Sequence, residues 1–151
     1  LAPNFDSVLA TELSRVGIAA AKCNLEANRV ENVKVAAISA EEFSAAYLDK
    51  QPHKKLQKAD IDLSEFSFGT VLVDPPRAGL DDLTVKLVST FDTIVYISCN
   101  PDTLHANLEE LCNSHDVKRF AVFDQFPYTD HIECGVLLQR RTAAEPADAA
   151  A

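Results

Sequence analysis

The chain has 151 residues, of which 47% are hydrophobic and 25% are charged, and its formal net charge is −9. These values fit one ordinary globular domain with a single core. No run approaches the roughly 18 to 20 consecutive apolar residues that a membrane helix needs, and the first residues lack the basic start and apolar stretch of a secretory signal. We therefore expect a cytoplasmic protein with no membrane partner.

Predicted strands and helices alternate along the chain, because short apolar runs are followed by stretches with helical spacing. In chain order they are a buried strand over 7–12, a helix over 14–28, a strand over 33–38, a helix over 40–49, a strand over 70–74, a helix over 81–90, a strand over 93–98, a helix over 101–112, and two closing strands over 117–123 and 134–139. A polar loop is expected over 51–67. A disordered tail is expected over 142–151, so that the domain spans 1–141.

Three local signals support these bounds. Ser14 is a suitable N-cap for the first helix. Pro75 and Pro76 stop the strand before them, because proline cannot donate to a sheet ladder. Pro101 is pre-organised for the first position of a helix.

The alternation predicts an α/β fold with a mostly parallel, doubly wound sheet covered on both faces. The closing strand pair indicates one antiparallel member. Ligands of such sheets bind outside the carboxyl ends of the strands. Glu12, Asp74 and Cys99 each close or directly follow a strand, so we expect them at the same rim.

The cysteines and the charge leave two questions about partners. The four cysteines form no C-x-x-C pair, which predicts reduced thiols. Cys112 and His115 have a spacing that a metal site could use, but no second pair completes it, so we expect no metal and interpret both as packing and helix-end residues.

The acidic net charge argues against a nucleic-acid partner, because Lys and Arg supply most of the affinity for phosphates. Local basic groups ease that conflict, and they are Lys54, Lys55 and Lys58, Lys118 with Arg119, and Arg140 with Arg141.

Acidic residues at two places could contact a nucleotide. A carboxylate at a strand end, such as Glu12, can accept both hydroxyls of a ribose, although a solvated Glu at a helix start is the alternative. Glu41 and Glu42 could cap a helix or approach an adenine.

Residues 73–80 read Val-Asp-Pro-Pro-Arg-Ala-Gly-Leu. The two prolines make the loop rigid and present Asp74 reproducibly, while Gly79 permits a tight backbone path. Methyltransferases that act on exocyclic amines commonly place an aromatic residue after Asp/Asn-Pro-Pro, where this chain has Arg77. That difference disfavours an amino-methyltransferase.

Cys99 lies in Ser-Cys-Asn-Pro, at the carboxyl end of a strand and just before a helix. Free amides and the helix dipole favour the thiolate that nucleophilic catalysis requires, although Asp102 in the first turn partly opposes this effect. A buried structural cysteine is the alternative.

Residues 126–135 read Phe-Pro-Tyr-Thr-Asp-His-Ile-Glu-Cys-Gly, a loop unusually rich in reactive side chains. Glu133 is a candidate general base, and His131 is its rival as acid or base. A Cys and His pair would also suggest a cysteine hydrolase, but neither residue lies in a hydrolase motif.

Together these segments resemble the RNA uracil-5-methyltransferase family, specifically its bacterial tRNA (uracil-5-)-methyltransferase (TrmA) branch. The resemblance covers about residues 4–140 and is carried by Asp-Pro-Pro-Arg-Ala-Gly-Leu from Asp74, Ile-Ser-Cys-Asn-Pro from Ile97, and Phe-Asp-Gln-Phe-Pro-Tyr-Thr-Asp-His-Ile-Glu-Cys-Gly from Phe123. The Gln-Phe-Pro-Tyr-Thr stretch favours the tRNA branch over the ribosomal RNA enzymes. RNA cytosine-5-methyltransferases typically carry Pro-Cys after the central strand, whereas Pro76 follows Pro75 here.

The resemblance implies a Rossmann-like class I S-adenosylmethionine-dependent methyltransferase fold. It also implies methylation of carbon 5 of the T-loop uridine (uracil-54) in tRNA, with S-adenosyl-L-methionine as cofactor and the T arm as partner. Cys99 would add to C6 of the uracil and Glu133 would remove the C5 proton. Glu12 would match the family's ribose-binding acid, and Asp74 the acid that lines the cofactor and target-base site.

The family also has an N-terminal RNA-recognition region and a first strand with a glycine-rich loop, and the sequence contains neither. We therefore expect a C-terminal fragment of the catalytic domain whose activity depends on the rest of the enzyme. Two alternatives stay open. One is methylation of ribosomal RNA, and the other is a non-catalytic RNA-binding or tRNA-folding module.

Overall fold

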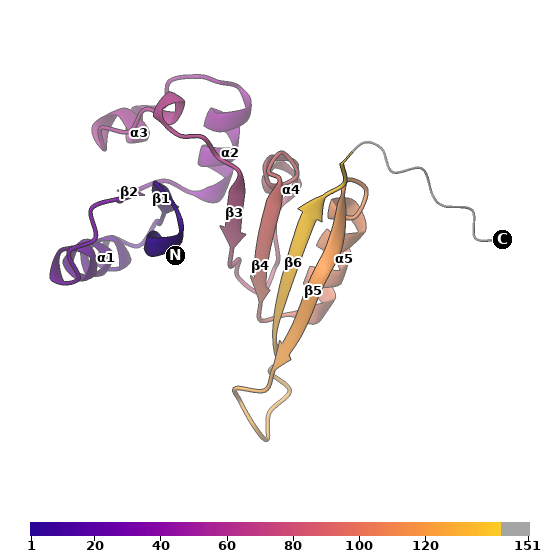
Figure 1. The fold of residues 1–151 in the computed structure, drawn as a ribbon. Helices are drawn as coiled ribbons and strands as arrows, with labels where there is room; N and C mark the ends of the chain where they lie inside the picture. The colour runs from indigo at the N-terminus through magenta and orange to yellow at the C-terminus, as the bar shows by residue number, and fades with distance from the viewer. Residues whose placement is uncertain (143–151) are drawn as a thin grey trace. The chain divides into compact units, whose positions relative to one another are not determined.

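The computed structural model describes residues 1–142, which fall into two compact units (Figure 1). The units are Leu1–Ser67 and Phe68–Ala151. Apart from Thr142, the predicted tail lies outside the described residues. No helix within the described part of the chain is long and apolar enough to cross a membrane.

The N-terminal unit contains a two-stranded parallel sheet and three helices. Its elements are β1 (Val8–Thr11), α1 (Arg15–Ala27), β2 (Val33–Ala36), α2 (Ala40–Leu48) and α3 (Lys54–Lys58), with 3-10 turns at Ala2–Asn4 and Leu63–Glu65. Two predictions were wrong here. The predicted loop over 51–67 contains α3 and a 3-10 turn, and β1 is half-buried to exposed instead of buried.

Side-chain caps explain where the first two long helices begin. Ser14 precedes α1, and its hydroxyl accepts a hydrogen bond from Gly17 N at 3.2 Å, as predicted. Ser39 and Glu42 form a reciprocal capping box at the start of α2. Lys55, together with that capping bond, lowers the pKa of Glu42. Glu42 therefore acts as a helix cap, one of the two roles considered for it.

The C-terminal unit is a four-stranded mixed sheet with two helices. Its elements are β3 (Thr70–Val73), α4 (Asp82–Val88), β4 (Thr93–Ser98), α5 (Pro101–Leu111), β5 (His115–Phe123) and β6 (Glu133–Arg140). The strand order is β3-β4-β6-β5. β3 and β4 are parallel, and β6 runs antiparallel to both of its neighbours. The predicted antiparallel member is thus confirmed as β6.

Both helices of this unit pack on one face of its sheet. Along β4 the buried residues alternate with half-buried ones, so that Ile94, Tyr96 and Ser98 share one face. The core on that face joins β4 and β6 to both helices, and it consists of Val85, Val88, Ile94, Tyr96, Leu104, Leu111, Cys134, Val136 and Leu138. Ile97 and Gly135, which are paired across β4 and β6, belong to the opposite face.

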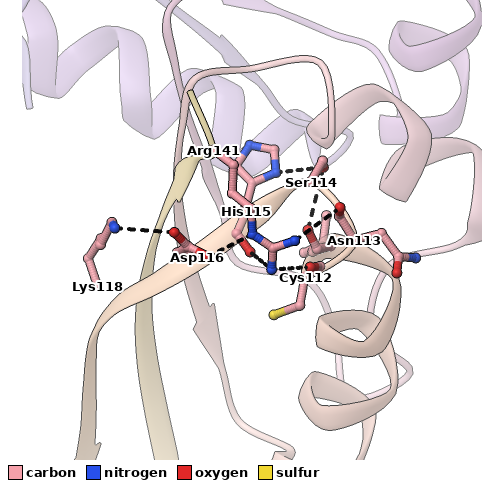
Figure 2. Close-up of polar contacts among 8 residues, drawn as sticks. Cys112, Asn113, Ser114, His115, Asp116, Lys118 and Arg141 are labelled. Atoms are coloured by element: carbon pink, nitrogen blue, oxygen red, sulfur yellow. Dashed lines mark hydrogen bonds and ion pairs between the residues drawn. The ribbon is translucent and has the colours of Figure 1, made fainter. Parts of the chain in front are cut away.

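The end of α5 is tied to the end of β6 by one arginine (Figure 2). Arg141 Nη2 donates to Cys112 O at 2.7 Å, and its Nε donates to Asp116 Oδ1 at 2.7 Å. The first bond satisfies a carbonyl that the helix leaves unpaired at its carboxyl end. The guanidinium therefore works as a C-terminal cap.

His115, three residues beyond the C-cap of α5, is buried, and its ring contacts the hydroxyl of Ser114 and the carbonyl of Phe91, each at 2.8 Å. Cys112 is the C-cap of α5. These roles agree with the packing and helix-end interpretation. Among residues 1–142, no three His, Cys, Asp or Glu side chains gather in a way that could hold a metal ion.

Several of the basic residues considered for RNA binding are paired within their own unit. Arg140 pairs with Asp92, Arg141 and Lys118 both pair with Asp116, and Lys55 pairs with Glu42. These contacts neutralise the cations locally, so they do not resolve the conflict between the acidic net charge and a nucleic-acid partner.

Candidate active site

The strand register brings the cysteine and glutamate segments together at one edge of the C-terminal sheet. Ser98 is opposite Cys134 in the last pair of the β4 and β6 ladder. The next residues outward are Cys99 and Glu133. On the other side of β6, Glu133 is paired with Phe123 of β5. The ends of β4 and β5 and the start of β6 therefore meet at this edge.

An open pocket with a volume of about 490 Å³ lies there, entirely within the C-terminal unit. Its lining residues are Asp74, Ile97, Cys99, Phe123, Gln125 and Glu133. Three of the four predicted site residues thus line one pocket. The six lining residues provide one thiol, two carboxyl groups, one amide and two apolar side chains.

Cys99 is held between a buried serine and the cap of α5. The Ser98 hydroxyl accepts a hydrogen bond from Asn100 N at 3.1 Å. Asn100 is the N-cap of α5, and its side chain accepts a bond from Asp102 N at 3.2 Å. Cys99 is half-buried and its thiol is free. The predicted location, between a strand end and a helix start, is confirmed.

Cys134 is the nearby alternative thiol, but it faces the other way. It is only 2% exposed and belongs to the core between the sheet and the helices. Burial, and to a lesser degree the neighbouring Glu133 carboxylate, raises the pKa of the Cys134 thiol. Of these two cysteines, Cys99 is the one that lines the pocket.

The loop that carries Asp74 is fixed by Asn107 of α5. Leu80 N donates to Asn107 Oδ1 at 2.9 Å, and Asn107 Nδ2 donates back to Leu80 O at 3.1 Å. Tyr96 Oη also donates to Asn107 Oδ1, at 2.7 Å. Burial raises the pKa of Tyr96 to about 12.

Glu133 and His131, the two candidates for general base, differ in position. Glu133 is half-buried and lines the pocket. His131 is exposed, and its Nδ1 lies 2.9 Å from Nη1 of Arg77. The geometry therefore favours Glu133 for a proton transfer inside the pocket.

Glu12 belongs to the N-terminal unit, where it directly follows β1. Its Oε1 accepts hydrogen bonds from Leu13 N at 2.7 Å and Ser14 N at 2.6 Å. The carboxylate thus turns toward the start of α1, although it remains exposed. Its predicted ribose contact stays a prediction.

Two features of the C-terminal unit, namely two of the pocket-lining residues and one contact between loops, were not assigned from the sequence. Gln125 and Phe123 line the pocket, and the unusual chemistry of the Gln-Phe-Pro-Tyr-Thr stretch was the signal that could have identified Gln125. The contact between Arg77 and His131 spans 54 positions and had no signal in the sequence.

Comparison with known proteins decides the family. The family model described as tRNA (Uracil-5-)-methyltransferase matches residues 1–141. The chain belongs to this family. A tRNA/tmRNA (uracil-C(5))-methyltransferase from Acinetobacter baumannii (strain AYE) is 54% identical over 140 residues, covering 93% of this chain and 39% of the relative. The family member of that description from Neisseria meningitidis serogroup B is 56% identical over 137 residues, covering 91% of this chain and 38% of the relative.

Solved structures agree with this membership. The Pyrococcus abyssi tRNA (uracil-54, C5)-methyltransferase, crystallised with S-adenosyl-L-homocysteine, has a TM-score of 0.68 and 28% identity over 91% of this chain and 30% of its own. The N-methyltransferase NodS from Bradyrhizobium japonicum has a TM-score of 0.64 at 12% identity, covering 94% of this chain and 70% of its own, and it supports the fold alone. The predicted Rossmann-like class I methyltransferase fold is confirmed. The chain described in this structure spans about 39% of the length of the curated relatives that it matches.

Proposed function

We propose that the protein containing this chain transfers a methyl group from S-adenosyl-L-methionine to carbon 5 of the T-loop uridine, uracil-54, of tRNA. The observation that supports this proposal most is the common pocket of Asp74, Cys99 and Glu133 in a chain of this family. The substrate is inferred from the relatives, whose names specify tRNA, tmRNA and uracil-54.

Cys99 acts as the nucleophile. Carbon 5 of uracil is a poor nucleophile, but addition of the Cys99 thiolate to C6 forms an S–C6 bond and moves the electrons of the C5–C6 double bond toward an enolate. C5 can then attack a methyl donor. The half-buried thiol at the pocket wall is suited to a planar ring that enters the pocket.

Glu133 acts as the general base. After methylation C5 carries both a hydrogen and the new methyl group. The Glu133 carboxylate removes that proton, the C5–C6 double bond re-forms, and the Cys99 thiolate leaves C6. Glu133 lines the same pocket as Cys99 from the neighbouring strand, so both groups can reach one ring.

S-adenosyl-L-methionine, when bound, supplies the methyl group as an electrophile. The residues present fit such a cofactor, because one carboxylate directly follows β1 and another directly follows β3, and each of these strands is parallel to its neighbour within its own unit. Ligands of this fold bind at the carboxyl ends of such strands. Glu12 would accept hydrogen bonds from the ribose hydroxyls, and Asp74 would line the region between the cofactor and the target base.

A covalent trap tests the nucleophile. The full-length protein is incubated with cofactor and a T-arm RNA that contains 5-fluorouridine, whose fluorine cannot be removed as a proton. We expect a stable adduct at Cys99, identified by peptide mass spectrometry and lost in Cys99→Ala. Cys134→Ala is the matched control and keeps the adduct if it folds. A cofactor-bound protein that forms no adduct, or forms one at another residue, would refute this chemistry.

The RNA class is tested separately. Nucleosides from tRNA and ribosomal RNA of a deletion strain are compared with those of the parent by mass spectrometry. We expect 5-methyluridine to disappear from the nucleosides of tRNA and to persist in those of ribosomal RNA. The reverse result would assign the enzyme to ribosomal RNA, and no change in either would favour a non-catalytic RNA-binding or tRNA-folding role.

A further inference from the structure

The Arg77 guanidinium connects two of the segments that form the pocket. Its Nη1 lies 2.9 Å from Nδ1 of His131. Arginine can only donate, so His131 Nδ1 accepts and the imidazole carries its single proton on Nε2. The contact therefore requires a neutral ring in one tautomer.

The backbone of Arg77 is anchored to the cysteine segment. Its carbonyl accepts a hydrogen bond from Asn100 Nδ2 at 2.9 Å and another from Thr103 Oγ1 at 3.2 Å. Asn100 directly follows Cys99 and caps α5. Arg77 thus has its main chain bonded to the residue that follows Cys99 and its side chain in contact with the loop before β6.

The loop before β6 orients His131 toward Arg77. Thr129 Oγ1 accepts from His131 N at 3.2 Å and donates to Phe126 O at 2.7 Å. The Phe126 ring meets the imidazole edge-on, with centroids 6.1 Å apart. These contacts fix the imidazole two residues before Glu133.

We propose that His131 is a positioning residue, which through Arg77 locks the loop leading to Glu133 against the loops that carry Asp74 and Cys99. The inference rests on the proposed function and assigns to His131 a role other than general base. The lone pair that a base would use is already directed at a guanidinium.

The physical reason is that two groups must act on one ring. Cys99 adds at C6, and Glu133 takes the proton from the adjacent carbon. The strand register sets the spacing of their main chains, but both residues stand at the last positions of that ladder, next to exposed loops, so the orientation of their side chains depends on contacts between those loops. A displacement of about 1 Å can reduce a rate about 100-fold.

Kinetics of variants of the full-length protein test this role. His131→Ala removes the acceptor, whereas Oδ1 of His131→Asn lies near the position of Nδ1 and can accept from Arg77. The matched control is His105→Ala, an exposed histidine of α5. We expect His131→Ala to lower kcat by about 10- to 100-fold and to slow formation of the 5-fluorouridine adduct, with KM for T-arm RNA nearly unchanged. His131→Asn should recover most of the rate.

Limited proteolysis tests whether the loop before β6 is held in place, and it does so independently of the methyl-transfer reaction. Tyr128 is fully exposed at the tip of the loop, so chymotrypsin can cleave after it. We expect faster cleavage in His131→Ala than in the wild type, and near-normal cleavage in His131→Asn. Equal cleavage in all three would overturn the positioning role.

The outcomes separate this inference from the proposed function. Normal adduct formation with blocked release in both His131 variants would overturn the positioning role and make His131 the base. Wild-type kcat in His131→Ala would show that the contact has no catalytic effect. Failure of the wild type to form any adduct would instead refute the proposed chemistry, while the cleavage rates would still decide the loop contact.

Discussion

The orientation of each side chain at the sheet edge determines which residues can take part in the reaction. Cys99 and Cys134 lie in neighbouring strand segments, yet Cys99 lines the pocket and Cys134 faces the helices. The alternation of strand side chains between two faces accounts for this difference. The same alternation explains why Glu133 lines the pocket while Cys134, the next residue, is buried.

Gly79 is a residue for which no side chain fits. Its φ is +78°, and a Cβ there would lie 2.8 Å from Asn107 Oδ1 and 3.0 Å from Thr103 Cβ. We expect Gly79→Ala to destabilise the protein by about 1–3 kcal/mol, through backbone strain and displacement of Asn107. Thermal unfolding of the full-length protein measures the effect.

The matched control for this change is Gly69→Ala in the same unit. No atom lies within 4 Å of a Cβ built at Gly69, so the control should change stability by no more than about 0.5 kcal/mol. Equal losses in the two variants would contradict the assigned constraint at Gly79.

Part of the pocket could be predicted at the level of residues. Asp74 and Cys99 follow strands with clear apolar runs, and Glu133 lies in a segment with recognisable family chemistry. The contact of Arg77 with His131 could not be predicted, because it depends on the path of an irregular loop. Periodicity in the sequence gives no information about such a path.

At the level of elements, predictions succeeded where local signals were strong. The strand over 93–98 was predicted with its observed bounds, because a run rich in β-branched residues begins and ends sharply. α3 was missed, because its five residues are too few for helical periodicity to appear. One antiparallel member was predicted from two closing strands without a helix between them, whereas the insertion of β6 between β4 and β5 was not predicted.

The cap at the end of α5 gives a prediction about stability and pH. The Arg141 guanidinium, bonded to Asp116, lowers the pKa of that carboxyl. We expect Arg141→Ala to lower the melting temperature by about 2–4 °C at pH 7. Arg119→Ala, another exposed arginine of the unit, should have a smaller effect and serves as control.

The sign of the pH dependence follows from the lowered pKa. A carboxyl whose folded-state pKa is depressed stabilises the protein above the ordinary Asp value of about 3.9, and this stabilisation is lost as pH falls through the folded-state value. The difference between wild type and Arg141→Ala should therefore shrink below about pH 4. A difference that grows on acidification would contradict the assigned ion pair.

At the scale of the whole molecule, the segment that matches the family model is longer than the unit that contains the pocket. The family model matches residues 1–141, whereas the pocket lies within the C-terminal unit alone. The relatives are more than twice as long as the matched segment. Cofactor binding and RNA recognition are therefore to be measured on the full-length protein.

The most direct test of the account follows the adduct formed with ordinary, unfluorinated T-arm RNA. In Glu133→Gln the full-length protein should form the bond between Cys99 and C6, transfer the methyl group, and release the RNA about 100-fold or more slowly than wild type. Cys99→Ala should form no adduct. Denaturing gels and peptide mass spectrometry over a time course measure both quantities. Release from Glu133→Gln at the wild-type rate would contradict the division of roles between Cys99 and Glu133.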